Sequence, residues 1–183
     1  MTKTPLIRRC AFLALLASMN SYAETCPAWM QTSLGKLHSK DNIQLCEVML
    51  NKVALVVNTA SHCGYTRQFS GLERLHQQFK DKGLVVIGFP SDDFNQEAED
   101  SAEIAEVCYK NYGVSFTMTD PVSVRGEQAI ALFQHLAGQT SQPSWNFNKY
   151  LLDAQGKVQG HFSSSVEPDD PRLLSMIESA LKQ

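Results

Sequence analysis

The sequence lacks several features that would assign a function directly. No two of its five cysteines have CxxC spacing, so neither a dithiol redox site of that type nor a zinc ribbon is supported. No cluster of Lys and Arg provides the electrostatic footprint of binding to nucleic acid or to an anionic membrane. After the N-terminal region no apolar run reaches the roughly 18 residues of a membrane-spanning helix, so we expect a soluble protein with no integral membrane segment.

The N-terminal segment has the pattern of a secretory signal peptide. Lys3, Arg8 and Arg9 precede a short apolar run, and the sequence SYA then places small residues at the −3 and −1 positions of a cleavage site after Ala23. A membrane anchor or an N-terminal helix fits less well, because the run is too short to span a bilayer. Cleavage removes three of the 16 basic residues and none of the 19 acidic ones, so residues 24–183 carry a net charge of −6. We expect an exported, periplasmic or secreted protein in an oxidising compartment, where cysteines pair or react.

Apolar patterns along the chain predict a single α/β domain after the signal peptide. Two unbroken apolar runs, residues 53–58 and 84–89, predict strands that are covered on both faces, as in a parallel sheet. Residues 66–83 between them carry an apolar stripe at helical spacing, with Thr66 and Gly83 as the expected helix caps. Strand, helix and strand therefore form a βαβ unit. No repeat, linker or low-complexity run interrupts the domain.

Weaker patterns add elements on either side of this unit. The capping-box spacing of Asp100 and Glu103 begins a second helix, which Gly113 ends. The other expected elements are an early hairpin within residues 37–52, a short helix near 127–136, a hairpin that turns at Gln155-Gly156 and a last helix after Asp170-Pro171.

Four cysteines remain once Cys10 leaves with the signal peptide. Cys26 and Cys46 lie close together in the irregular N-terminal region, so we expect a structural disulfide between them. Cys63 follows the carboxyl end of a predicted parallel strand, where open α/β folds place ligands and chemistry. The free N–H groups and the dipole of the following helix favour a negatively charged sulfur there. These residues alone leave Cys63 open as a reactive thiol or a structural cysteine, whereas Cys108, beside the apolar stripe of the second helix, is typical of a core cysteine.

Four motifs in order, from about Leu37 to the C-terminus, resemble those of the glutathione peroxidase family. Residues 53–90 resemble the strand, loop and helix that carry the family's nucleophile, with cysteine where some members have selenocysteine. FPSDDFNQE resembles the second motif, EIAEVCYKNYGVSF the third and WNFNKYLLDAQGKV the fourth. The resemblance implies a thioredoxin-like fold, in which helices flank a central mixed β-sheet.

The same resemblance implies a set of catalytic residues. Cys63 would be the peroxidatic cysteine, and Gln96, Trp145 and Asn146 would surround its sulfur. Their side chains carry N–H donors that can stabilise a thiolate and orient a peroxide. Without the motif, Trp145 would be typical of a core aromatic residue. Cys108 matches the resolving cysteine of members that use two cysteines and are recycled by thioredoxin-like reductants.

The implied reaction needs no metal or bound cofactor. The Cys63 thiolate would attack the O–O bond of hydrogen peroxide or of an organic or lipid hydroperoxide, release water or an alcohol and become a sulfenic acid. Cys108 would condense with it to a disulfide, which an external thiol reductant, a thioredoxin-like protein or glutathione, would reduce. No basic cluster suited to the carboxylates of glutathione stands out, which favours a protein dithiol.

The second motif departs from the family pattern. It is one residue shorter, with Ser91, Asp92 and Asp93 after FP, so Gln96 is open to displacement from the site. The short connection LAGQTSQPSWNF lacks the long insertion tied to tetramers, which favours a monomer.

Two other functions remain open from the sequence. One is a peroxide sensor that passes its oxidation to a partner protein as a disulfide. The other is a thiol–disulfide oxidoreductase, which the missing CxxC weakens. Catalytic consumption of peroxide with a dithiol reductant would distinguish an enzyme from both.

Overall fold

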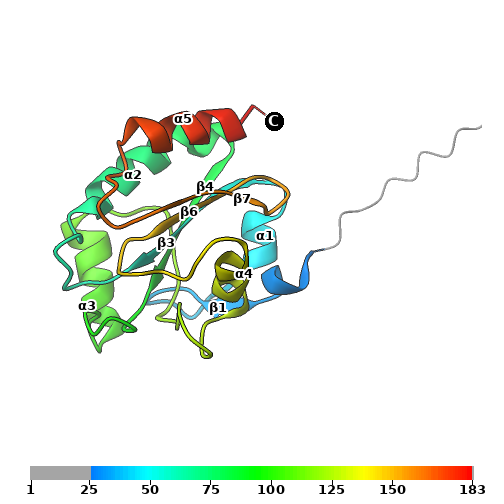
Figure 1. Cartoon of the computed structure of the whole chain (residues 1–183). Coiled ribbons are helices and arrows are strands. Elements are labelled where there is room, and N and C mark those ends of the chain that lie inside the picture. The colour runs from blue at the N-terminus through cyan, green and yellow to red at the C-terminus, as the bar shows by residue number, and fades with distance from the viewer. Residues whose placement is uncertain (1–25, 183) are drawn as a thin grey trace, which may run out of the picture.

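A five-stranded mixed β-sheet forms the centre of the molecule (Figure 1). The computed structural model describes residues 26–182, so the predicted signal peptide lies outside the described residues. The strand order is β5-β4-β3-β6-β7, with β3, β4 and β5 parallel, β6 antiparallel to β3, and β7 antiparallel to β6. The strands are β3 (Val53–Thr59), β4 (Leu84–Pro90), β5 (Thr117–Met118), β6 (Lys149–Leu152) and β7 (Val158–Phe162).

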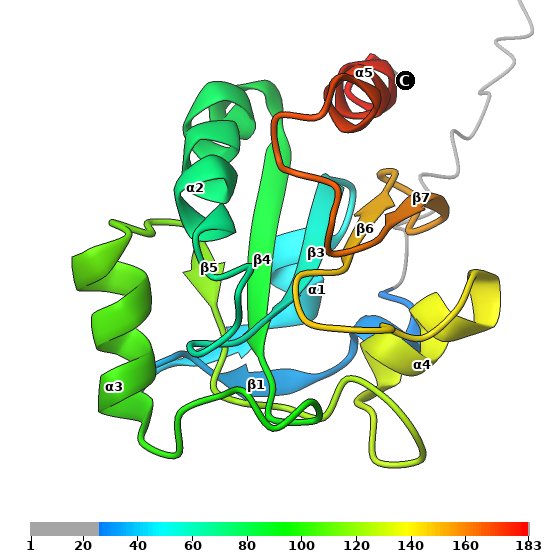
Figure 2. The same cartoon turned by 60° about the vertical axis from the view of Figure 1, so that its left-hand side comes forward.

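Helices cover both faces of the sheet (Figure 2). Side chains from α2, α3 and α5 pack on one face, and side chains from α1 and α4 pack on the other. This arrangement confirms the α/β architecture expected from the sequence. The helices are α1 (Leu45–Met49), α2 (Gln68–Phe79), α3 (Ser101–Ala105), α4 (Ala131–Gln139) and α5 (Pro171–Ala180), with short helical turns η1 (Ala28–Met30) and η2 (Lys80–Lys82) and a π-helical segment η3 (Glu106–Asn111).

Strand β3 divides its side chains between the two cores. Val53, Leu55 and Val57 face the core under α2, α3 and α5, whereas Ala54 and Val56 face the core under α1 and α4. All seven residues of β3 are buried. An unbroken apolar run therefore suits this strand, because neither of its faces meets water.

The predicted βαβ unit is present. β3 and β4 pair in parallel from Val53 opposite Leu84 to Thr59 opposite Pro90, so both carboxyl ends open at the same edge of the sheet. Gly83 has a φ of 99° after η2 and ends the connecting helix as expected. Thr66 does not cap that helix: α2 begins only at Gln68, because residues 60–67 form turns instead.

The early hairpin lies nearer the N-terminus than the sequence predicts. Its strands are β1 (Ser33–Gly35) and β2 (Asn42–Gln44), and the following residues form α1 instead of a strand. Leu45 and Met49, four residues apart, both point into the core, a spacing that buries one face of a helix.

The later elements follow the sequence more closely. The hairpin β6–β7 turns at Gly156, whose φ is 78°, and the Asp170 carboxylate caps α5 by accepting from the Arg172 N–H. The short helix expected near residues 127–136 begins only at Ala131. Ile130 before it has an extended backbone, and its N–H donates to the Ser123 carbonyl.

The second predicted helix changes type along its length. Asp100 caps it by accepting from the Ala102 N–H, as expected, but Glu103 does not close a capping box. The Glu103 carboxylate instead lies 3.3 Å from the imidazole of His62, on the loop after β3. The α-helical turn of α3 widens into the π-helical η3, and Gly113 follows it with a φ of 65°.

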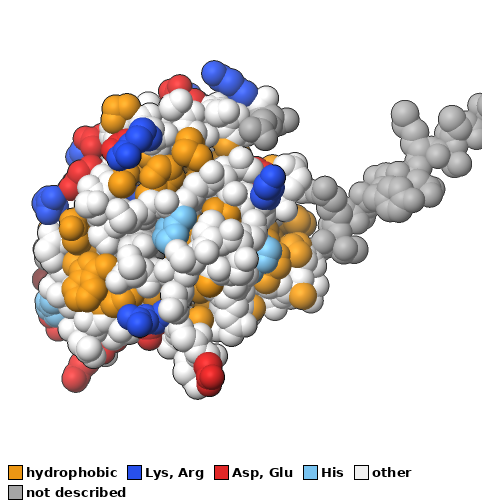
Figure 3. Space-filling view, in the orientation of Figure 1, with side chains coloured by type: hydrophobic (Ala, Val, Ile, Leu, Met, Phe, Trp, Pro, Cys, Tyr) orange, Lys and Arg blue, Asp and Glu red, His pale blue; other side chains and the backbone are white. Residues whose placement is uncertain are grey.

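Within residues 26–182, no helix is long and apolar enough to cross a membrane. On the face seen in Figure 3, the Lys and Arg side chains lie apart from one another, and some of them lie next to Asp or Glu. This face therefore presents no continuous basic patch.

A disulfide joins Cys26 to Cys46, as expected from the sequence. Their Cα atoms are 6.0 Å apart, within the range that the bond requires. The bridge ties the start of the described chain to α1, where both cysteines pack against the core under α1 and α4. Cys63 belongs to the opposite core, so the bridge lies apart from that residue.

We expect the double variant Cys26→Ser/Cys46→Ser to fold with lower stability. The bridge closes a loop with a sequence separation of 20, for which the loss of unfolded-state entropy is worth about 3 kcal/mol. For a chain of this length, that corresponds to a fall in Tm of roughly 6–12 °C. Scanning calorimetry with and without reductant measures it. Reductant should lower the Tm of the wild type and leave that of the variant unchanged; equal melting of the two oxidised proteins would contradict a stabilising bridge.

Candidate active site

Cys63 lies in the loop that leaves the carboxyl end of β3. It is a free cysteine, and only 8% of its surface is exposed. The Thr66 hydroxyl accepts from the Cys63 N–H at 3.1 Å and donates to the Ala60 carbonyl at 2.9 Å, so it fixes both sides of the turn. The Cys63 sulfur accepts the N–H of Tyr65 at 3.5 Å. The N–H that hydrogen-bonds to the sulfur therefore comes from the turn itself, whereas the sequence pattern predicted donors from the first turn of the following helix.

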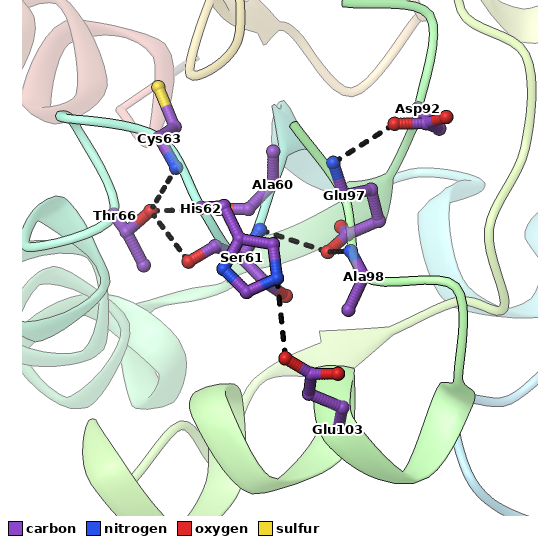
Figure 4. A network of polar contacts seen from close by, with 9 residues as sticks. All are labelled: Ala60, Ser61, His62, Cys63, Thr66, Asp92, Glu97, Ala98 and Glu103. Carbon is purple, nitrogen blue, oxygen red and sulfur yellow. Dashed lines mark hydrogen bonds and ion pairs between the residues drawn. The ribbon is translucent and has the colours of Figure 1, made fainter. Parts of the chain in front are cut away.

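The loops that follow β3 and β4 are joined by hydrogen bonds (Figure 4). The Ser61 N–H donates to the Glu97 carboxylate at 2.9 Å, as Figure 4 shows. The His62 N–H donates to the Gln96 carbonyl at 2.9 Å. Glu97 is buried, and burial raises the pKa of its carboxyl. We call these hydrogen bonds the joint between the two loops. The Cys63 side chain points away from the joint, as Figure 4 shows. The joint therefore positions the loop that carries Cys63 without engaging its sulfur.

Gln96 reaches Asn146, although the second motif is shortened. The Asn146 Nδ2 donates to the Gln96 Oε1 at 3.2 Å. Asn146 is fully buried, and its Oδ1 has no hydrogen-bond partner. Within residues 26–182, no hydrogen bond engages the Gln96 Nε2. Within residues 26–182, the side chains of Gln96 and Asn146 therefore have N–H donors and one amide oxygen, the Asn146 Oδ1, that no other group engages.

The aspartates of the shortened motif explain how Gln96 keeps this place. The Asp92 carboxylate accepts from the Glu97 N–H at 3.1 Å, and Asn95 adopts a φ of 55°, which turns the chain tightly. The Asp93 carboxylate accepts from the N–H groups of Val124 and of the following residue. Both carboxylates thus hold backbone amides in place.

Trp145 is not a core aromatic residue. It is 40% exposed, and its ring lies 5.3 Å from that of Phe94. Phe94 in turn lies under the guanidinium of Arg125, at 5.0 Å. Its indole is therefore partly accessible to solvent, which a core position would not allow.

A cluster of buried polar side chains holds the turn that carries Trp145 and Asn146. The Trp145 carbonyl accepts from the side-chain amides of Asn58 and Asn148, at 3.0 and 2.9 Å. The Asn146 carbonyl accepts from the Ser164 hydroxyl. No sequence motif pointed to these residues or to Glu97. The one available signal was the position of Asn58, a polar residue inside an apolar strand.

Cys108 lies in η3 and is almost completely buried, with 1% of its surface exposed. Burial raises the pKa of its thiol to about 12, and the negative charge of Glu97 adds to the effect. Cys108 and Cys63 are both free and belong to the same core, under α2, α3 and α5. In the described form, Cys108 is therefore an unreactive thiol.

The structure thus unites part of the predicted site. Gln96 and Asn146 are in contact, and Trp145 adjoins them, but no hydrogen bond from these three reaches the Cys63 sulfur in the described part of the chain. In the same part, no group of three His, Cys, Asp or Glu side chains is arranged to hold a metal ion. What the described residues offer chemically is a thiol on a fixed turn and, on the loops of Gln96 and Asn146, N–H donors that have no partner.

Comparisons with known proteins identify the family of the chain. A family model described as glutathione peroxidase matches residues 33–137, which include Cys63, Gln96 and Cys108 and end before Trp145. A glutathione peroxidase-like peroxiredoxin of Schizosaccharomyces pombe is 44% identical over 136 residues, which cover 71% of this chain and 85% of that protein. A hydroperoxy fatty acid reductase of Synechocystis sp. is 41% identical over 136 residues, which cover 74% of this chain and 88% of that protein.

A solved structure gives the same result for the fold. The crystal structure of Trgpx in apo form superposes with a TM-score of 0.67 at 28% identity and covers 87% of this chain and 98% of that one. The chain therefore belongs to the glutathione peroxidase family, has its thioredoxin-like fold and is an oxidoreductase that acts on peroxide.

Proposed function

We propose that the protein is an exported thiol peroxidase in which Cys63 is oxidised by the peroxide and Cys108 resolves the oxidised cysteine. The observation that carries this proposal is the free Cys63 on a fixed turn whose neighbour His62 hydrogen-bonds to Gln96, the residue that in turn contacts Asn146. Hydrogen peroxide and organic hydroperoxides are the substrates.

The first step is attack of the Cys63 thiolate on the distal oxygen of the peroxide. The O–O bond breaks, the leaving oxygen takes a proton and departs as water or an alcohol, and Cys63 becomes a sulfenic acid. The free donors of Gln96 and the indole N–H of Trp145 stabilise the charge on the leaving oxygen. Asn146 holds the Gln96 side chain in place by donating to its Oε1.

The second step is disulfide formation with Cys108. Cys108 loses its thiol proton and attacks the sulfenic sulfur, and hydroxide leaves and is protonated to water. A buried thiol with a pKa of about 12 cannot do this in place, so η3 has to open first. Its π-helical form supports this step, because π-helical turns are rare and concentrate at functional sites.

The third step is reduction of the Cys63–Cys108 disulfide by an external dithiol. A thioredoxin-type protein is the reductant that we favour over glutathione, since the relative from Schizosaccharomyces pombe is named a peroxiredoxin. The relative named a hydroperoxy fatty acid reductase supports hydroperoxides of fatty acids among the substrates. The exposure of Trp145 also suits substrates too large for a closed pocket. We expect a monomer, because the connection before Trp145 is short.

Substitution of the two cysteines should separate the steps. Peroxide consumption with a thioredoxin system should fall to background in Cys63→Ser, because the nucleophile is gone. Cys108→Ser should consume one equivalent of peroxide and then stop, because its sulfenic acid has no resolving partner. The matched control is Cys26→Ser/Cys46→Ser, which should turn over like the wild type. Multiple turnovers by Cys108→Ser with thioredoxin would contradict a resolving role, and a wild type that is oxidised without turnover would favour a sensor.

Mass spectrometry locates the bond directly. Iodoacetamide should leave Cys108 of the reduced native protein unmodified, because the thiol is buried and protonated, and should modify it after denaturation. After one equivalent of peroxide, a Cys63–Cys108 peptide linkage should appear. An oxidised Cys63 beside a free Cys108 would overturn the proposed second step.

Gln96→Ala tests the hydrogen-bonding shell. We expect kcat/KM for the peroxide to fall by about 10²-fold, as when a donor to a developing negative charge is removed. Tm should stay near that of the wild type, because Gln96 is only half buried. Gln155→Ala, in the exposed turn between β6 and β7, is the control and should keep the full rate. An unchanged rate in Gln96→Ala would remove Gln96 from the site.

Export is tested on the full-length chain. Expressed in a Gram-negative host, the protein should appear in the periplasm with Glu24 as its first residue, since the residues before it have the signal-peptide pattern. Ala23→Arg should block cleavage and leave the precursor in the cell, because the −1 position requires a small residue. A wild-type chain that keeps Met1 and stays in the cytoplasm would contradict export.

A further inference from the structure

Lys149 is a buried cation that the reaction described above does not use. It lies in β6 with none of its surface exposed. It pairs with Val57 across the sheet, and its side chain therefore points to the face under α2 and α5, the face to which Cys63 also belongs. Lysine is almost never fully buried unless it is paired, so its presence here calls for a reason.

The ammonium of Lys149 has one hydrogen-bond partner within residues 26–182. Its Nζ donates to the Phe147 carbonyl at 2.8 Å. An ammonium carries three donors, so two have no protein partner. The Glu167 carboxylate is the charged group that acts on it from outside β6, and it favours the protonated form. The hydrogen bond to the Phe147 carbonyl is therefore the main interaction that this buried ammonium makes.

Phe147, the residue after Asn146, has an unusual backbone conformation. Its φ is 61°, a left-handed conformation that residues other than glycine rarely adopt. Its N–H donates to the Asn58 carbonyl at 2.6 Å, so Lys149 binds the one backbone group of Phe147 that β3 does not. Phe147, whose N–H and carbonyl are both held in this way, directly follows Asn146, and the side-chain amide of Asn146 contacts Gln96.

Lys149 completes a series of contacts along this turn. The carbonyls of three successive residues, from Trp145 to Phe147, each accept from at least one buried side chain. The first two carbonyls are held by neutral amides and a hydroxyl, and the third is held by the ammonium. A left-handed residue between two functional side chains and a strand needs such support on both sides.

We propose that Lys149 is a positioning residue, whose ammonium holds the Phe147 carbonyl and thereby keeps the Asn146 amide and the Trp145 indole directed at the reacting peroxide. This inference rests on the proposed function, because it assigns Lys149 a part in the chemistry at Cys63.

The energetics separate this role from a structural one. Burial lowers the pKa of Lys149 to about 7 from 10.5, so the folded state binds its proton less readily than the unfolded state. The resulting loss of stability is complete below about pH 7 and disappears above about pH 10.5. At neutral pH this charge therefore lowers stability. A residue kept in place despite such a cost is better explained by function than by folding.

The experiment compares Lys149→Met with Lys157→Met in the chain from residue 24. Methionine fills a similar volume without charge or donor, and Lys157 is an exposed lysine in the turn after β6. Neither variant should melt below the wild type, and Lys149→Met should melt at the same temperature or higher, because it removes a charge that lowers stability. The rate constant for oxidation of Cys63 by peroxide, measured by stopped flow, should fall by about 10-fold or more in Lys149→Met, because small displacements at a reacting centre are costly. Lys157→Met should react at the wild-type rate.

A double-mutant cycle shows whether Lys149 acts through Asn146. In an Asn146→Ala background, Lys149→Met should cause a smaller further loss than it causes in the wild type, since one of the two groups that it positions is absent. Additive losses would overturn the proposal, as would a wild-type rate in Lys149→Met. Failure of Lys149→Met to fold, or a large fall in its Tm, would assign the residue to folding and overturn the proposal as well. The outcome is distinct from failure of the proposed function, which a fully active Cys63→Ser would reveal.

Discussion

The joint between the loops after β3 and β4 is the constraint on which the site depends. Parallel pairing brings the carboxyl ends of both strands to one edge, and the N–H groups of Ser61 and His62 then bind the carboxylate of Glu97 and the carbonyl of Gln96. One loop carries the sulfur and the other carries the glutamine, so the separation of the loops is set by one backbone–backbone hydrogen bond and by one bond to a buried carboxylate. Hydrogen bonds to a buried carboxylate are stronger than those between neutral groups. Burial of Glu97 therefore makes the joint stiff.

The elements that the sequence predicted are those with a strong local signal. The strands at 53–58 and 84–89 were evident because an unbroken apolar run is typical of a strand that is buried on both faces. The caps at Asp100 and Asp170 were evident because a carboxylate before a helix satisfies free N–H groups. The start of α2 was wrong because Thr66, a good cap by composition, is used in the turn around Cys63. The single hydroxyl of a threonine can stabilise either the helix cap or the turn, and tertiary contacts decide which of the two forms.

The site was less predictable, since its geometry depends on contacts between distant segments. The sequence could not show that Gln96 survives a shortened motif, because its place depends on the bond from the Glu97 N–H to Asp92. It could not distinguish an exposed Trp145 from a buried one, since both satisfy the same motif. Lys149 illustrates the limit best: in an alternating strand pattern a lysine would be assigned to solvent, whereas the structure buries it and directs its ammonium to the Phe147 carbonyl.

The burial of Cys108 gives the proposed cycle its order. A thiol with a pKa of about 12 and 1% of its surface exposed has almost no thiolate and no access to peroxide, so oxidation begins at Cys63 alone. Resolution then requires η3 to open, an event that costs less free energy than global unfolding because it exposes one short segment. Opening also takes the Cys108 thiol out of the interior and away from Glu97, which removes both causes of its raised pKa. The conformational change that lets the two sulfurs meet is therefore the same change that makes Cys108 a nucleophile, and neither a buried thiolate nor a base on η3 is needed to form the disulfide.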